Sequence, residues 1–249
     1  MEHLVELLTQ LNSFDLIQVV FWGLAGAVSF YFSIGNARVW TSISIGFFLI
    51  FLEQAYAINP LAHYSKLTAF HYIIGTIAIM LITHGFLEYY VFCKTFEITG
   101  KKLYVYLSTL ILLAFSGLFL IINPAPGPGT IRNIKMIENA IWVFLCGMNL
   151  EILRKIFDSI KDSTISKGFV AFVFVFAFIF LWKGSELYLQ VFLWDKDWQD
   201  ILAVMTDETS DIDMYPLRVQ FSQAVSRYAG LCSGLSVGGT FIYIYRLLK

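Results

Sequence analysis

The sequence predicts an all-α integral membrane protein, a seven-transmembrane-helix bundle with its N-terminus outside and its C-terminus in the cytoplasm. First, 58% of the residues are hydrophobic and only 14% are charged, whereas a soluble domain is about half apolar and about a quarter charged. Second, seven stretches approach the roughly 20 apolar residues that cross a bilayer. Third, basic residues gather in the connections on one side.

The seven stretches follow one another along a single predicted transmembrane domain, residues 1–249. The fifth is interrupted by Asn149 and Glu151, and the seventh is rich in Ser, Gly and Gln, which favours a place inside the bundle. The predicted spans are residues 16–34, 39–58, 69–92, 103–122, 137–157, 168–194 and 217–248.

Three segments outside the spans have patterns of their own. In residues 1–14, four leucines fall on one helical face, which predicts a short interfacial helix before the first span. The run NPAPGPG at 123–129 predicts a stiff connector without helix. The segment between the last two spans is acidic and is expected to be an outer loop.

Basic residues set the predicted orientation, because cytoplasmic connections carry the excess of Lys and Arg. With the C-terminus inside, the outer side has five basic residues: Lys66, Arg132, Lys135, Lys196 and Arg218. The inner side then has ten: Arg38, Lys94, Lys101, Lys102, Arg154, Lys155, Lys161, Lys167, Arg246 and Lys249.

Charged side chains inside the spans are the first candidates for a functional site, since each is costly to bury unless it is paired or hydrated. Lys183 and Glu186 are three residues apart on the sixth span and share a face. On the seventh span one face carries three polar side chains, Gln220, Gln223 and Arg227. We expect these two faces to meet in an outward-opening polar pocket, which Glu53 and His71 would complete; Glu138 is placed at a similar depth.

A salt-bridge network that only holds helices together would use the same residues, and the sequence leaves both interpretations open. A second pair, His84 and Glu88, has the four-residue spacing of a proton-relay pair or of two metal ligands. A metal would need further ligands, and the chain has four histidines in all. No metal site is therefore predicted.

Haem b and retinal are both disfavoured, and no cofactor is predicted. His71 and His84 are thirteen residues apart, which places their rings about 140° apart around a helix rather than on one face. In topology the chain resembles the microbial rhodopsins, whose last helix carries the lysine that binds retinal. Here the last span has no interior lysine, so the resemblance is architectural only.

Small residues recur every four positions on the seventh span, at Ser226, Gly230, Gly234 and Gly238. A stripe of this kind lets another helix approach closely. We favour packing within the bundle over packing against another subunit.

The function that these features favour is a receptor-like or accessory subunit, which binds a ligand or partner through the outer pocket between the sixth and seventh spans. The alternative is a transporter or an ion or proton channel that uses the buried Glu, Lys and Arg side chains. An intramembrane enzyme ranks third, because no HExxH or GxSxG motif occurs.

The expected surroundings are a lipid bilayer, with another membrane or cytoplasmic protein, or a second copy, as the partner. Nucleic acid is excluded as a partner because the chain has no basic patch or arm. The expected location is the bacterial inner membrane.

Overall fold

The computed structural model describes residues 13–35, 39–57, 65–96, 101–161, 163, 166–206 and 212–247, and every element in these ranges is helical. Seven helices are long: α2 (Ser13–Gly35), α3 (Val39–Ala57), α4 (Ser65–Thr95), α5 (Lys102–Ile122), α6 (Pro128–Ile160), α7 (Ser166–Phe192) and α9 (Leu217–Leu247). A short helix α8 (Trp198–Thr206) and a 3₁₀ turn η2 (Ile212–Met214) lie between α7 and α9. The interfacial helix predicted for residues 1–14 falls mainly on residues 1–12, which lie outside the described residues.

Five of these helices contain a segment long and apolar enough to cross a membrane. They are α2 (over Leu16–Ile34), α4, α5, α6 and α7. The chain thus has the helices of an integral membrane protein, as its composition predicts.

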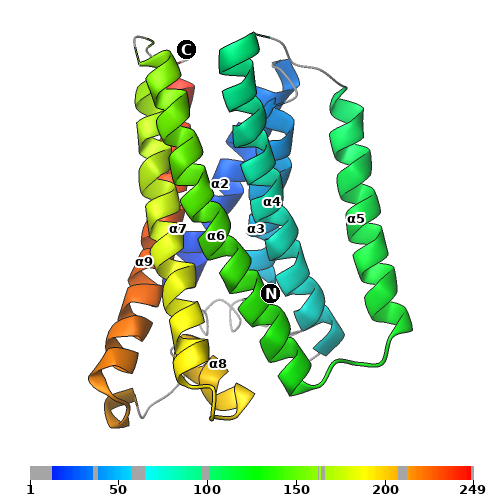
Figure 1. Cartoon of the computed structure of the whole chain (residues 1–249), viewed down its shortest axis with the longest axis vertical. Helices are drawn as coiled ribbons and strands as arrows, with labels where there is room; N and C mark the ends of the chain where they lie inside the picture. The colour runs from blue at the N-terminus through cyan, green and yellow to red at the C-terminus, as the bar shows by residue number, and fades with distance from the viewer. Residues whose placement is uncertain are drawn as a thin grey trace, which may run out of the picture.

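Six of the long helices form a closed ring in the order α2, α3, α4, α6, α7, α9 and back to α2 (Figure 1). The helices stand side by side, and α8 lies at one end of the bundle, which we call the α8 end (Figure 1). The remaining long helix, α5, stands outside the ring and packs mainly against α4 (Figure 1). Correspondingly, only 11% of its most apolar window is buried.

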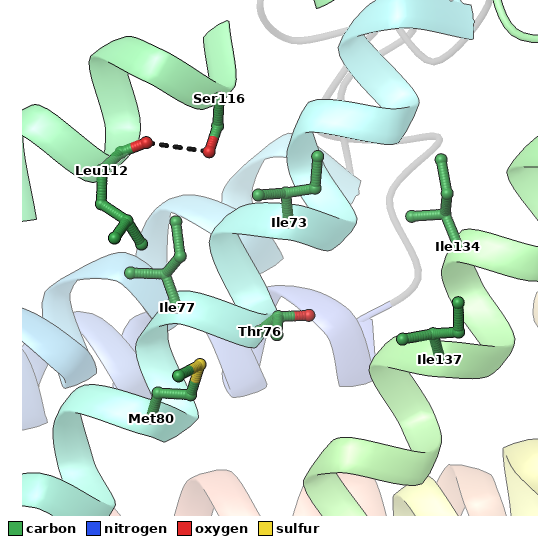
Figure 2. Close-up of a pocket in the computed structure, with 8 residues that line it drawn as sticks. All are labelled: Ile73, Thr76, Ile77, Met80, Leu112, Ser116, Ile134 and Ile137. Atoms are coloured by element: carbon green, nitrogen blue, oxygen red, sulfur yellow. Dashed lines mark hydrogen bonds between the residues drawn. The ribbon is translucent and has the colours of Figure 1, made fainter. Parts of the chain in front are cut away.

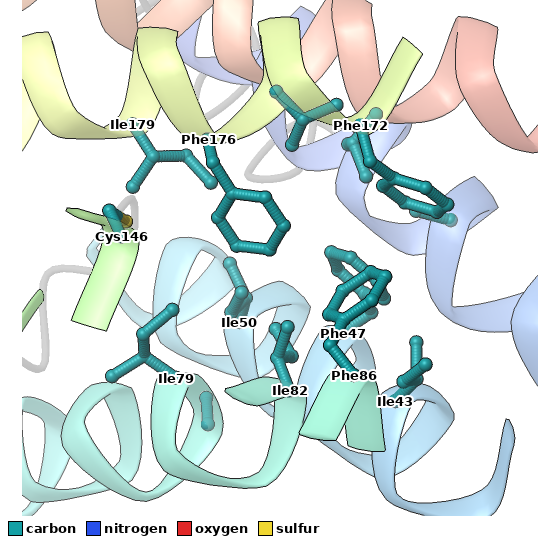
Figure 3. Close-up of a cluster of buried hydrophobic side chains, with 14 of the residues drawn as sticks. Ile43, Phe47, Ile50, Ile79, Ile82, Phe86, Cys146, Phe172, Phe176 and Ile179 are labelled. Atoms are coloured by element: carbon teal, nitrogen blue, oxygen red, sulfur yellow. The ribbon is translucent and has the colours of Figure 1, made fainter. Parts of the chain in front are cut away.

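The interior of the ring is filled by aromatic and aliphatic side chains (Figure 3). Phe241 of α9 packs edge to face on Phe47 of α3 and Phe172 of α7, with ring centroids 5.2 and 5.4 Å apart. Phe86 of α4 packs in the same way on Phe172, at 5.1 Å. Such contacts add about 0.5–1.5 kcal/mol each to the area that they bury, so this layer ties four of the six ring helices together.

Helix α6 begins earlier than predicted, at Pro128 instead of residue 137. The prediction that residues 123–129 contain no helix is therefore wrong for Pro128 and Gly129. The reason is that proline is favoured in the first helical turn, where its missing N–H has no partner to lose. The earlier start places Lys135 within the helix.

Helix α8 lies in the segment predicted to be an acidic loop. Its side chains Trp198, Ile201 and Val204 recur every three residues and are all buried, which is the pattern of a helix with one apolar face. They pack with Leu189 of α7 and with Val219 of α9. Helix α8 thus covers the end of the bundle with a small apolar layer.

Candidate functional site, a buried charge cluster

Five charged side chains meet inside the ring near the α8 end. We call them the charge cluster: Glu53 of α3, Lys135 and Glu138 of α6, and Lys183 and Glu186 of α7. All are buried, with exposed fractions between 1% for Glu53 and 8% for Glu186. The cluster joins α3 to two consecutive helices much later in the chain, α6 and α7.

Lys183 lies at the centre of the cluster. Its Nζ is 3.1 Å from Glu138 Oε1 and 3.5 Å from Glu53 Oε1. The indole rings of Trp142 and Trp182 flank the same ammonium group, with centroids 5.1 and 4.4 Å from Nζ. Aromatic faces attract a desolvated cation, so this charge is compensated by both the carboxylates and the rings.

Lys135 joins the two carboxylates of α6 and α7. Its Nζ is 3.0 Å from Glu138 Oε2 and 3.2 Å from Glu186 Oε2. The ring of Tyr72 on α4 lies beside this lysine, with its centroid 4.8 Å from Nζ. Glu138 therefore bridges the two lysines through its two oxygens, and α6 supplies the middle of the network.

Gly75 of α4 provides the space in which the carboxylates meet. A Cβ at this position would lie 2.8 Å from Glu53 Oε2 and 2.9 Å from Glu138 Oε1. A side chain at this position would require the two carboxylates to shift, so the absence of a side chain on α4 is what lets the two glutamates approach the same lysine in this arrangement.

His71 lies beside the cluster and does not pair with a carboxylate in the contacts described. Its Nε2 donates to the backbone carbonyl of Glu53 at 2.8 Å. Its ring contacts those of Tyr56 and Tyr72, with centroids 4.9 and 5.0 Å away. His71 thereby fixes the end of α3 that carries Glu53.

The cluster has an excess of acid. Three carboxyl groups face two ammonium groups, so full ionisation leaves one negative charge. Within the described part of the chain, Glu53 Oε2 has no hydrogen-bond partner, and neither do the amide atoms of Asn139, the residue after Glu138. A buried, uncompensated charge is costly. One added unit of positive charge would make the fully ionised cluster neutral.

Apolar layers bound the cluster on both sides. Toward the α8 end, the layer under α8 includes Tyr72, Leu189 and Ile201. Toward the opposite end, the layer in Figure 3 places Ile50, Ile79, Cys146 and Ile179 across the ring. The described helices thus enclose the charges between the apolar layer under α8 and the aromatic core of the ring.

The structure brings together five of the charged or titratable residues that the sequence indicated: Lys183, Glu186, Glu53, Glu138 and, beside them, His71. The partners expected from α9 are placed differently. Gln220 donates to the Tyr215 carbonyl at 2.8 Å, in the turn before α9. Gln223 is buried, whereas Arg227 is exposed and so does not belong to the buried group.

The second predicted pair, His84 and Glu88, lies on α4 toward the opposite end. His84 Nε2 is 3.9 Å from Glu88 Oε1, and the His84 side chain is 49% exposed. Ser42 Oγ of α3 is 3.4 Å from His84 Nδ1. Among the described residues, no three His, Cys, Asp or Glu side chains gather as metal ligands.

The small-residue stripe of α9 lies inside the ring. A Cβ at Gly234 would be 3.3 Å from Gln18 Cα, and one at Gly238 would be 2.2 Å from Phe21 Cδ1, both on α2. Gly230 lies against Trp182 of α7, and Ser226 is buried. The stripe therefore lets α9 approach α2 and α7 closely.

Three participants were not predicted: Lys135, Gly75 and the cover α8. Lys135 was counted as an outer basic residue because the span was started at residue 137. In a helix that begins before residue 135, Lys135 and Glu138 are three residues apart and share a face, so their spacing would have indicated an ion pair. Gly75 carries no signal in the sequence, since its role depends on α3 and α6 lying across from it.

Comparison of the chain with protein-family models, with curated proteins and with solved structures gave no match.

Proposed function

We propose that this protein is a receptor-like or accessory membrane subunit, and that its charge cluster binds one small cation, a proton or a monovalent metal ion, from the outer side. Binding would be passed through α8 and the helices of the ring to another membrane or cytoplasmic protein, or to a second copy. The proposed location is a bacterial inner membrane.

The charge imbalance carries this proposal. A cluster of three carboxyls and two ammonium groups becomes neutral when it gains one unit of positive charge. Glu53 Oε2 supplies an oxygen without a hydrogen-bond partner in the described part of the chain. A network evolved only to hold helices together would be more stable with equal numbers of acids and bases.

The surface above the cluster favours a cationic ligand. Around α8, the acidic side chains Asp195, Asp197, Asp200 and Asp213 are exposed. Among the described residues they outnumber by one the basic side chains near them, Arg132, Lys196 and Arg218. Acidic residues at the mouth of a site raise the local concentration of cations. A cation that arrives at this surface has only the apolar cover of α8 to pass before it reaches Glu186 and Lys135, the two most exposed members of the cluster.

We propose that all seven long helices span the membrane, with the α8 end outside. In the ring, α3 and α9 lie between helices that are apolar enough to cross a membrane. The 19 residues of α3 extend about 28 Å, which is close to the thickness of a bilayer core. The buried polar residues of α9, such as Ser226 and Ser233, face the ring interior. Lys94 and Arg246 lie in the last turns of α4 and α9, at the opposite end, as a cytoplasmic face requires.

The second candidate is a transporter. Polar groups continue on α4 and α6 beyond the layer of Ile79 and Cys146, where Asn149 donates to Thr83 Oγ1 at 2.9 Å and His84 lies near Glu88. Opening the layer at Ile79 and Cys146 would join the two polar regions into one path. The receptor is favoured because this layer is closed and none of the described helices is broken by proline in its interior.

Two measurements on the same protein separate these functions. Proteoliposomes are tested for proton and monovalent-cation flux, and a fluorophore on α8, attached through Asp200→Cys after the native cysteines are replaced by alanine, reports movement of the cover. A receptor moves α8 when the cation is added and gives no flux. A transporter gives flux that Glu53→Gln abolishes.

The matched control is Glu151→Gln, which removes an exposed carboxylate near the other end of α6. It should leave the fluorescence response unchanged, whereas Glu53→Gln should remove it. If wild-type protein gives neither flux nor a cation-dependent signal, the cluster is structural and the proposed function is wrong.

A further inference from the structure

A groove separates α5 from the rest of the bundle. It has a volume of about 300 Å³ and is lined by α4, α5 and α6 (Figure 2). Six of the lining side chains are apolar: Ile73, Ile77, Met80, Leu112, Ile134 and Ile137. Figure 2 shows Leu112 of α5 opposite Ile77 of α4, with Ile134 and Ile137 of α6 on the other side.

Two lysines hold α5 at its ends. At the α8 end, Lys66 of α4 donates to the carbonyl of Ile121 at 3.0 Å. At the opposite end, Lys102 donates to the carbonyl of Ser33 on α2. Between these attachments α5 has few buried side chains, Val105 and Thr109 among those described. The helix is thus fixed at both ends while the groove stays open along its second half.

The groove has no free polar group to offer. Thr76 Oγ1 donates to the Tyr72 carbonyl at 3.0 Å, and Ser116 Oγ donates to the Leu112 carbonyl at 2.8 Å (Figure 2). Both hydroxyl donors are therefore used within their own helices. Water needs two to four polar partners to occupy a cavity, so the occupant of this groove is apolar.

The position of the groove decides which apolar molecule reaches it. The groove opens outward between helices that are long and apolar enough to cross a membrane, and its lining side chains Met80, Leu112 and Ile137 are themselves about half exposed. A slender hydrocarbon chain fits, and the bilayer in which these helices stand supplies one.

We infer that a phospholipid acyl chain occupies the groove between α5 and the pair α4 and α6, and that this bound lipid completes the packing of α5. The inference is independent of the charge cluster, since none of the five charged residues lines the groove. It assigns α5, which contributes no residue to the cluster, a role as one wall of a lipid site.

Photocrosslinking tests this inference. The protein is reconstituted in nanodiscs of phosphatidylethanolamine and phosphatidylglycerol that contain a phospholipid with a diazirine in the middle of its acyl chain. After illumination, mass spectrometry maps the modified residues. We expect modification at Met80, Leu112 and Ile137 about tenfold above that at Leu110, an α5 residue that is 64% exposed but does not line the groove.

Filling the groove should remove this enrichment. In Ile77→Phe/Ile137→Phe, modification at Met80 and Leu112 should fall to the level of Leu110, while Leu110→Phe leaves the enrichment intact. If the double variant does not fold, native mass spectrometry of wild-type protein decides: one phospholipid per chain retained after delipidation supports the site. Equal modification of groove and exposed positions, or no retained phospholipid, overturns the inference.

Discussion

Gly75 of α4 occupies the position at which a Cβ would collide with the carboxyl group of Glu53, 2.8 Å from its Cδ. The two residues belong to neighbouring helices, and the glycine lets the Glu53 and Glu138 carboxyls approach Lys183 from two sides. The charge cluster thus depends on a residue that carries no charge.

The first prediction concerns Gly75→Ala. The added methyl group should displace Glu53 and lower the thermal unfolding temperature in detergent, with a loss of about 1–3 kcal/mol from overpacking. Gly147→Ala on α6 is the control, because its Cβ would meet nothing within 4 Å. That variant should be neutral or stabilised by up to about 1 kcal/mol, since alanine favours helix. Equal stability of the two variants would show that the charge cluster does not need a glycine at position 75.

The second prediction concerns Lys183→Met. Without this ammonium group the cluster retains three carboxyls and one lysine, and breaking a buried pair in this way costs about 3–5 kcal/mol. Adding Glu138→Gln removes one uncompensated charge, so the double variant should be more stable than Lys183→Met alone. Denaturation of the wild type, both single variants and the double variant by detergent or heat provides the comparison. Additive losses in the double variant would show that the two side chains do not interact.

The third prediction concerns the approach of α9 to α2. In Gly238→Leu the first side-chain carbon would lie 2.2 Å from Phe21 Cδ1. We expect a loss of about 1–3 kcal/mol in unfolding free energy, as for other overpacked sites. The neighbouring variant Gly239→Leu points into open space and should keep wild-type stability. If both variants are equally stable, α9 does not pack closely on α2.

The fourth prediction concerns topology. Single cysteines at Asp195 near α8 and at Lys161 after α6, in a background without native cysteines, report the two ends of the bundle. A membrane-impermeant maleimide added to spheroplasts should label position 195 and leave position 161 unlabelled until the membrane is opened. The reverse pattern would place the acidic surface in the cytoplasm.

Much of the fold could be predicted because apolar length is a local property. The start of α9 at Leu217 and the end of α5 at Ile122 match the predicted spans, and the other long helices differ mainly by a few residues at their ends. The sequence does not predict the start of α6 because polar residues interrupt the segment 128–136, with Arg132, Asn133 and Lys135 between its apolar residues. Helix α8 was missed because its acidic residues obscured the period-three pattern of Trp198, Ile201 and Val204.

The site was harder to predict than the fold, because it depends on which helices are neighbours. The spacing of Lys183 and Glu186 within one helix identifies them as a pair, but nothing in the sequence favours α6 over α9 as the helix that supplies their partners. The ring order places α6 and α9 on either side of α7. The side of α7 that carries Lys183 meets Glu138 of α6, whereas Arg227 of α9 is exposed.

The number of cations bound per chain tests the proposal that the charge cluster holds one small cation. Nanodisc-embedded protein is titrated with sodium, lithium and potassium salts by calorimetry at fixed pH, and proton uptake is measured separately after a pH jump. We expect one bound cation or one extra proton per wild-type chain, and none in Glu53→Gln, whose cluster is already neutral. Glu151→Gln should bind as wild type does. No binding by the wild type, or the same binding by Glu53→Gln, would contradict the claim that the cluster holds one exchangeable positive charge.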